Sequence, residues 1–165
     1  MKKVFTFLLL AFIAISAAQV RAQEFEKYIG NTKLRLLINN DYEIIIWGFV
    51  NSSTQFSESF VIPEKITAPN GKKYKVTTIG DDARLSGGFA SITIPRTVEY
   101  IGPNAFKYCP NLKTVYIKGS PQVNKNAFIQ CTALEKVYIT GRKEFGDSFP
   151  IANGGKARIY RQQGS

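Results

Sequence analysis

The chain has 165 residues, with 22 lysines and arginines against 12 aspartates and glutamates, and its formal net charge at pH 7 is +10. It contains no histidine, which excludes Ser-His-Asp and Cys-His catalytic arrangements and removes the commonest zinc ligand. The apolar content is ordinary at 44%. A chain of this length predicts one globular domain that buries about two-thirds of its unfolded surface.

Residues 1–22 have the pattern of a secretory signal peptide. Two lysines precede an apolar run from Val4 to Ile15, which a stretch of small residues follows. Val20-Arg21-Ala22 predicts cleavage after residue 22, and Ser16-Ala17-Ala18 is a second candidate cleavage site. A membrane anchor is the weaker alternative, because the apolar run is too short to cross ~30 Å of hydrocarbon. The pattern predicts a secreted, periplasmic or cell-surface protein without a membrane span in the mature chain.

Cleavage would leave a basic mature chain. It removes Lys2, Lys3 and Arg21 and no acid, so the formal charge falls from +10 to +7. In a secreted protein this charge favours anionic glycans or acidic protein surfaces as partners, and we expect no nucleic acid. The alternative is that the charge only keeps the protein soluble.

The first part of the mature chain carries a hairpin signal. Two runs rich in β-branched and aromatic residues flank a polar turn: Lys33–Ile38, Tyr42–Val50 and, between them, Asn39-Asn40-Asp41. This pattern predicts a β-hairpin. We expect residues 23–60 to form an N-terminal β cap that packs Ile44, Ile46 and Trp47 on the core. The alternative for Trp47 is an exposed ring that stacks on a ligand.

Residues 61–165 contain an internal repeat. Phe106–Ile117 and Phe128–Ile139 follow one template, a period of 22 residues apart, with the spacing Leu-x-x-Val-x-Ile. A period of about 20–29 residues with this spacing is typical of a leucine-rich repeat. Phe89–Ile94 is a further copy, and the period predicts a last strand at Ala157–Tyr160. We therefore expect about three repeats and a partial C-terminal one.

Two more strands are predicted ahead of the clear repeats. Phe60-Val61-Ile62-Pro63 and Tyr74–Ile79 are apolar and β-branched, and the turn sequence Pro69-Asn70-Gly71 lies between them. The pair Ile79-Gly80 recurs in the next repeat as Ile101-Gly102. The repeat therefore begins in a degenerate copy, as terminal repeats often do.

Alternation along each strand predicts which side chains point inward. The expected apolar ladder consists of Ile92, Ile94, Leu112, Val115, Ile117, Leu134, Val137 and Ile139. Asn104–Cys109 and Asn126–Cys131 lack alternation and predict short helical turns, with Phe106 and Phe128 as wedges between layers. Because no repeat buries its apolar face alone, stacking must stabilise the fold.

These segments resemble the BspA-type leucine-rich repeats of bacterial surface and secreted proteins. The matching motifs, within about residues 60–141, are Val61-Ile62-Pro63, Tyr74–Gly80, Ile92–Pro95, Val98–Gly102, Asn104-Ala105-Phe106, Cys109 and Leu112–Val115. The resemblance implies a β-rich, right-handed solenoid with a parallel sheet on one face. It also implies an adhesive role towards surface macromolecules. Family members usually carry many more repeats, so a smaller binding face is expected here.

The outward residues of the repeat strands are the candidate binding residues: Thr93, Thr114, Tyr116, Lys118, Lys136, Tyr138, Thr140, Arg158 and Tyr160. The three tyrosines recur in register, which would stack them at the ~4.8 Å spacing of strands. Tyrosine beside lysine and arginine is typical of binding surfaces. The alternative is that the tyrosines only stabilise the sheet, by ~0.2–1 kcal/mol per pair.

Other chemistry has weak support in the sequence. Asp81-Asp82 and Asp147 are the acids that could bind a metal, but the first two lie in a predicted turn and are expected to be solvated. Cys109 and Cys131 lie one period apart, so a disulfide is conceivable at a ~5 Å separation, but parallel side chains fit its dihedral angle poorly. We expect two free, buried cysteines.

Taken together, the residues predict a secreted, non-enzymatic binding module without cofactor, metal or catalytic residues. Its partner would be an extracellular or envelope protein or glycan. A structural or assembly role in the cell envelope and electrostatic binding of anionic glycans are the alternatives.

Overall fold

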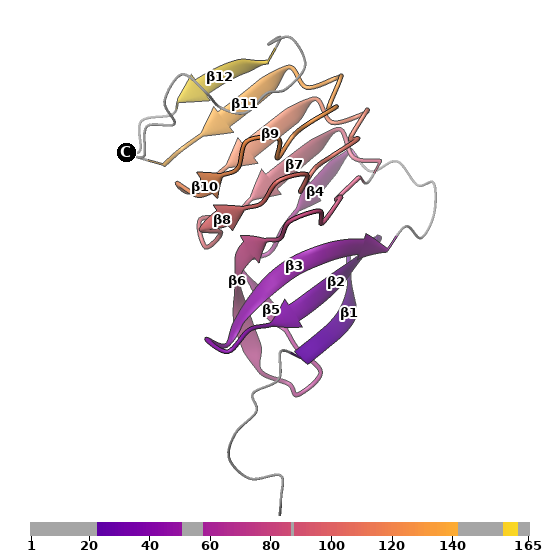
Figure 1. Ribbon diagram of the computed structural model, residues 1–165, viewed down its shortest axis with the longest axis vertical. Helices are drawn as coiled ribbons and strands as arrows, with labels where there is room; N and C mark the ends of the chain where they lie inside the picture. Colours follow the sequence, from indigo (N-terminus) through magenta and orange to yellow (C-terminus); the bar gives the residue numbers. More distant parts are fainter. Residues whose placement is uncertain (1–22, 51–57, 87, 142–156, 162–165) are drawn as a thin grey trace, which may run out of the picture.

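The computed structural model describes residues 23–50, 58–86, 88–141 and 157–161. Within these ranges the chain consists of strands and turns and contains no helix. The strands form two sheets, and the C-terminal coils are stacked above one another (Figure 1). Both sheets contribute to one continuous apolar core. The predicted β-rich solenoid is confirmed.

The sheet that we call the repeat sheet consists of five parallel strands in the order β12-β11-β9-β7-β4. Its strands are β4 (Ser59–Val61), β7 (Ser91–Ile94), β9 (Thr114–Ile117), β11 (Lys136–Ile139) and β12 (Arg158–Arg161). Strands β7, β9 and β11 lie at the predicted repeat positions, and the predicted C-terminal strand is present as β12. Each strand comes from a successive coil, as Figure 1 shows.

The second sheet, which we call the mixed sheet, has the order β1-β2-β3-β6-β8-β10, and β5 pairs with β6 outside this path. Its strands are β1 (Gln23–Ile29), β2 (Thr32–Ile38), β3 (Glu43–Val50), β5 (Lys65–Thr67), β6 (Lys73–Ile79), β8 (Tyr100–Ile101) and β10 (Gln122–Val123). The predicted hairpin is confirmed as the antiparallel pair β2–β3. Parallel pairing of β3 with β6 joins this hairpin directly to the coils.

The turn at residues 69–71 connects different strands from those expected. The antiparallel partner of β6 is β5, whereas β4 pairs with β7 in the repeat sheet. Both predicted strands are therefore present, but they do not pair with each other across this turn. The physical reason is that Pro63 ends β4, so the chain crosses over and a further three-residue strand forms before the turn.

The core contains the predicted apolar ladder. All eight residues of that ladder are at most 4% exposed. Phe106 and Phe128 stack inside it with ring centroids 4.7 Å apart and an interplanar angle of 4°. Ile44 and Ile46 of β3 are fully buried in the same core. The hairpin thus extends the core that the coils build.

The segments predicted as helical turns are runs of hydrogen-bonded turns instead. Asn104 and Tyr108 have φ angles of 57° and 58°, in the left-handed region, and such residues interrupt a right-handed helix. Their neighbours bond between coils: the Phe106 N–H donates to the Ala127 carbonyl at 2.8 Å. Backbone donors used in this way are not available for a helical ladder, which is why the prediction fails.

The sequence predicts that Trp47 packs on the core, and this prediction is wrong. Trp47 lies next to the buried Ile46 but is 36% exposed, and the Arg35 guanidinium lies 5.6 Å from the centroid of its ring. The alternation of β3 explains this result, because Ile44 and Ile46 take the inward positions and Trp47 follows on the other face.

Candidate functional site

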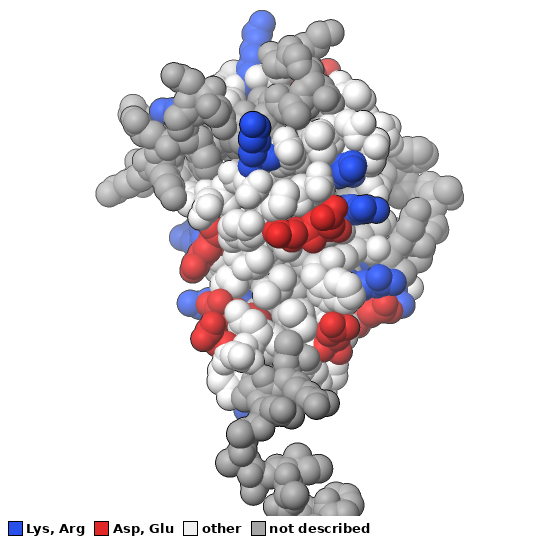
Figure 2. Space-filling view, in the orientation of Figure 1, with Lys and Arg blue, Asp and Glu red and all other residues white. Residues whose placement is uncertain are grey.

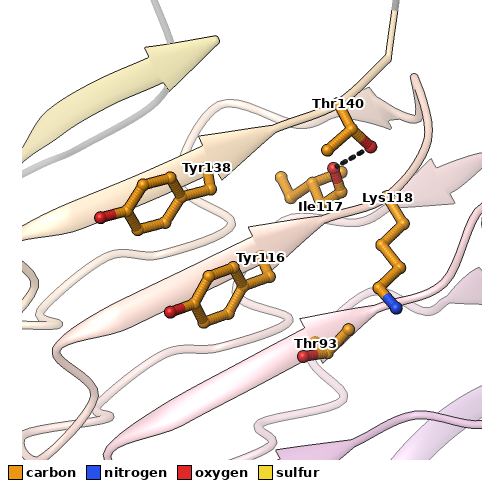
Figure 3. Close-up of a pocket in the computed structure, with 6 residues that line it drawn as sticks. All are labelled: Thr93, Tyr116, Ile117, Lys118, Tyr138 and Thr140. Atoms are coloured by element: carbon orange, nitrogen blue, oxygen red, sulfur yellow. Dashed lines mark hydrogen bonds between the residues drawn. The ribbon is translucent and has the colours of Figure 1, made fainter. Parts of the chain in front are cut away.

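The outward side chains of the repeat sheet form columns because its parallel strands are in register. The first column contains Ser91, Thr114, Lys136 and Arg158, and the second contains Thr93, Tyr116, Tyr138 and Tyr160. Lys118 and Thr140 follow the ends of β9 and β11 beside the second column (Figure 3). The fold therefore gathers the residues that the sequence proposed as binding candidates on one face.

Three tyrosines of the second column stack on one another, and we call them the tyrosine ladder. The ring centroids of Tyr116 and Tyr138 are 5.0 Å apart at an interplanar angle of 9°, and those of Tyr138 and Tyr160 are 4.9 Å apart at 19°. Tyr116 is 41% exposed and Tyr160 36%. The ladder thus presents ring edges and hydroxyls to solvent.

A depression of about 220 Å³ lies between the tyrosine ladder and the residues that follow the strands. It is lined by Thr93, Tyr116, Ile117, Lys118, Tyr138 and Thr140 (Figure 3). The Thr140 hydroxyl donates to the Ile117 carbonyl at 3.4 Å. Ile117 is the one lining residue that the sequence did not propose, because its side chain belongs to the inward ladder.

The other four proposed residues lie outside the depression. Thr114, Lys136 and Arg158 belong to the first column, and Tyr160 ends the tyrosine ladder. The sequence missed Val61, which is in register with Thr93 and 57% exposed. Its place in the apolar triplet that precedes Pro63 suggested a buried residue and gave no signal of exposure.

The charged side chains on the described strands of this face are all basic. Strands β7, β9, β11 and β12 contain no acidic residue. Lys118, Lys136 and Arg158 are exposed there. Two exposed acids immediately precede strands of this sheet, Glu135 before β11 and Glu58 before β4. On the face shown in Figure 2, acidic and basic side chains lie interspersed. The repeat sheet therefore favours an anionic or hydroxyl-rich ligand.

A second exposed cluster lies on the hairpin side of the mixed sheet. Glu26 forms ion pairs with Lys33 and Arg35. Lys33 lies 5.8 Å from the ring centroid of Tyr28, and Arg35 covers Trp47. The hydrogen bond from Lys33 is the main cause that lowers the pKa of Glu26, and the same bond raises the pKa of Lys33. The charged groups of this cluster are therefore paired with one another or with aromatic rings across strands β1, β2 and β3.

The turn acids bond to the neighbouring coil. Tyr100 donates its hydroxyl to Asp81 at 3.2 Å, and Asn104 donates to Asp82 at 3.2 Å. Burial and the charge of Asp81 raise the pKa of Tyr100. Within the described ranges no three potential metal ligands come together. Asp147 lies outside the described residues.

Both cysteines are free and buried, as expected. The Cys109 thiol donates to the Leu85 carbonyl at 3.2 Å, and the Cys131 thiol donates to the Phe106 carbonyl at 3.0 Å. Contact with the Cys131 side chain and burial raise the pKa of the Cys109 thiol. The two cysteines therefore occupy equivalent positions in successive coils, where each thiol donates a hydrogen bond to a backbone carbonyl.

Short coils with in-register parallel strands and an inward apolar ladder define a β solenoid of the leucine-rich repeat class. Residues 52–149 match the family model described as "BspA type Leucine rich repeat region (6 copies)". The match covers more than half of the chain, so the chain belongs to the BspA-type leucine-rich repeat family. The resemblance inferred from the sequence is confirmed.

Solved bacterial structures share this fold. A leucine-rich repeat protein from Bacteroides capillosus is 25% identical, with a TM-score of 0.62, and the match covers 84% of this chain and 99% of that one. A leucine rich cell surface protein from Faecalibacterium prausnitzii is 26% identical, with a TM-score of 0.53, and the match covers 71% and 32%. A leucine-rich repeat protein from Bacteroides ovatus is 20% identical, with a TM-score of 0.50, and the match covers 88% and 37%.

The chain thus spans almost the whole length of the first of these structures and about a third of the other two. The comparison with curated proteins gives no significant match. In the part of the chain that the structure describes, no helix has the length and apolar character needed to cross a membrane. The predicted signal peptide, residues 1–22, lies outside the described residues.

Proposed function

We propose that the chain is a secreted or surface-located, non-enzymatic binding module that recognises an extracellular or envelope protein or glycan through the repeat sheet. Membership of the BspA-type family supports a role in surface binding. The Faecalibacterium relative is described as a cell surface protein, and the signal-like pattern of residues 1–22 fits the same location.

The observation that carries the proposal is the exposed tyrosine ladder beside cations on strands that contain no acidic residue. Tyrosine and arginine are enriched among residues that dominate binding energy, and tyrosine gives a large contact area with few rotatable bonds. The ladder also lies on parallel strands whose pairing is continuous, so the backbone holds each side chain in register. A rigid, aromatic and basic surface of this kind is suited to recognition.

The first experiment is a binding array with residues 23–165. Matrix glycoproteins, sulfated glycans and bacterial envelope polymers are immobilised, and binding is measured at low and high salt. A double variant, Tyr116→Ser with Tyr138→Ser, is then compared with the unchanged chain. We expect affinity for the identified partner to fall about tenfold or more, as for loss of a hot-spot residue.

The matched control removes two exposed tyrosines outside the repeat sheet. Tyr28 and Tyr108 are 58% and 55% exposed, so the variant Tyr28→Ser with Tyr108→Ser loses the same groups elsewhere. We expect it to bind within about twofold of the unchanged chain. Equal binding by the two double variants would exclude the tyrosine ladder as the contact surface. Absence of any binding, with self-association in sedimentation, would favour the assembly role.

A further inference from the structure

The tyrosine ladder ends where strand β7 carries a threonine. Thr93 is in register with Tyr116, and the following strands carry Tyr138 and Tyr160 in the same column. One face of the Tyr116 ring stacks on Tyr138. Beside the other face, among the described residues of this column, stands the short side chain of Thr93 (Figure 3). The ladder therefore leaves one aromatic face open, and the depression lies beside it.

A cationic side chain lies on the Thr93 side of the Tyr116 ring, and a threonine hydroxyl lies at the other end of the depression, after β11 (Figure 3). Lys118 points towards Thr93 along the wall of the depression (Figure 3), and no ion pair is found for it among the described residues. Its ammonium group can only donate hydrogen bonds. The Thr140 hydroxyl already donates to the Ile117 carbonyl, so its free lone pairs can only accept. The ring face itself carries partial negative charge and attracts C–H groups.

A ligand that fits the open ring face and Lys118 together needs a flat C–H face and, beside it, a hydrogen-bond acceptor, for which an anion is the strongest. A sugar ring that bears a carboxylate has both within one unit. An acidic amino-acid side chain has the carboxylate without the flat face, and an aromatic side chain has the face without the charge. The set of groups in the depression therefore discriminates between these classes.

We propose that the depression binds an acidic sugar unit of a glycan, stacked on the open face of Tyr116 with its carboxylate on Lys118. This inference rests on the proposed function and specifies the partner of the same face. Lys136 and Arg158 in the neighbouring column would attract further acidic units of the same polymer. Their attraction is screened over about 8 Å at physiological salt, whereas stacking on Tyr116 is not.

The test measures binding of the purified chain to three probes by isothermal titration calorimetry at physiological salt. The first is an oligosaccharide of galacturonic acid, and the second is the same oligosaccharide with its carboxylates reduced to alcohols. The third is an oligoglutamate peptide of equal charge. We expect the acidic oligosaccharide to bind about tenfold more tightly than either of the others, as for loss of one charge-assisted hydrogen bond or one stacking contact.

Substitution at Thr93 tests the open ring face directly. Thr93→Tyr would extend the ladder by one ring and move the open face one strand away, above Val61 and away from Lys118. We expect about tenfold weaker binding of the acidic oligosaccharide. Thr93→Val keeps a short β-branched residue and should bind within about twofold of the unchanged chain. Far-ultraviolet circular dichroism and the melting temperature establish that both variants fold.

Substitution at Lys118 tests the anion contact. Lys118→Gln should lower the affinity for the acidic oligosaccharide about tenfold and leave the affinity for the reduced oligosaccharide unchanged. The control is Lys125→Gln, an equal loss of charge at an exposed lysine after β10 on the mixed sheet. It should change neither affinity by more than about twofold.

Three outcomes would overturn the inference, and the binding array then decides whether the proposed function also fails. Equal binding of the peptide and the acidic oligosaccharide, or full binding by Thr93→Tyr, would remove the acidic-sugar site but leave a sheet face that binds another partner. Absence of acidic-oligosaccharide binding, together with a partner from the array that depends on Tyr116 and Tyr138, would have the same meaning. If the array also gives no partner, the proposed function fails as well.

Discussion

The repeat stacks aromatic rings twice, once inside the molecule and once outside. Phe106 and Phe128 lie 4.7 Å apart at 4°, and Tyr116 and Tyr138 lie 5.0 Å apart at 9°. The two geometries are almost the same because both pairs are one period apart in register. Their surroundings differ: the phenylalanines are at most 1% exposed, whereas Tyr116 is 41% exposed.

The stacking geometry therefore follows from the register of the strands, and it does not tell whether a stack stabilises the fold or binds a ligand. The energetic weight of a stack depends on the apolar surface that it removes from water, at about 25 cal/mol per Å². The inner rings remove nearly all of theirs, and the outer rings keep a large part exposed. The inner stack must then hold the coils together, and the outer stack remains available to contact a ligand.

Removal of one inner ring is the most direct test of whether the inner stack holds the coils together. Phe128→Ala should lower the free energy of unfolding by about 3–5 kcal/mol, because it leaves a cavity between coils that a rigid backbone cannot fill. Urea unfolding measures the change, with Phe128→Leu as a control that keeps most of the volume and should lose much less. A loss below about 1 kcal/mol for Phe128→Ala would show that the stack does not hold the coils.

The next largest effect concerns the close approach of neighbouring coils at Gly102. A Cβ atom at this position would lie 2.7 Å from the Asp81 backbone nitrogen and would also collide with the Asp81 carboxylate. The Gly102 N–H bonds to the Ile79 carbonyl at 2.8 Å, so the coils cannot separate without losing that bond. We expect Gly102→Ala to cost about 1–3 kcal/mol, as overpacking does.

The equivalent glycine of the preceding repeat is the control for Gly102. At Gly80 the nearest atom to an added Cβ is the Ile46 carbonyl oxygen, 3.3 Å away. That neighbour needs to move by only a few tenths of an ångström, so Gly80→Ala should cost clearly less in the same urea unfolding experiment. Equal losses at both positions would mean that the conformational freedom of the glycine backbone, and not contact between coils, explains the glycines.

The sequence was sufficient to predict the repeat, because apolar residues recur at fixed spacing and alternate within each strand. Val115 and Val137 are buried as expected, and Tyr116 and Tyr138 stack as expected. The second sheet of the coils was missed, because β8 and β10 have two residues each and are too short to show alternation. β1 was missed because it alternates between partly buried and exposed residues without a strong apolar face.

The site was predicted less completely than the fold. The outward residues could be listed from alternation, but their grouping into a depression depends on contacts that a sequence does not contain. Thr93 pairs with Tyr116 across 23 positions, whereas Tyr116 pairs with Tyr138 across 22, so a fixed period would place Ile94 in the column. The direction of Lys118 and the hydrogen bond of Thr140 likewise follow only from the folded backbone.

The smallest expected effect on stability lies at the centre of the tyrosine ladder. Tyr138→Ala removes both outer stacking contacts, with Tyr116 and with Tyr160, yet should cost only about 0.4–2 kcal/mol, because each cross-strand pair contributes ~0.2–1 kcal/mol. Urea unfolding and binding to the partner found in the array are measured on the same preparation. Binding should fall about tenfold while the chain stays folded. A variant as unstable as Phe128→Ala would assign the outer ladder to structure, because burial would then not separate the two stacks.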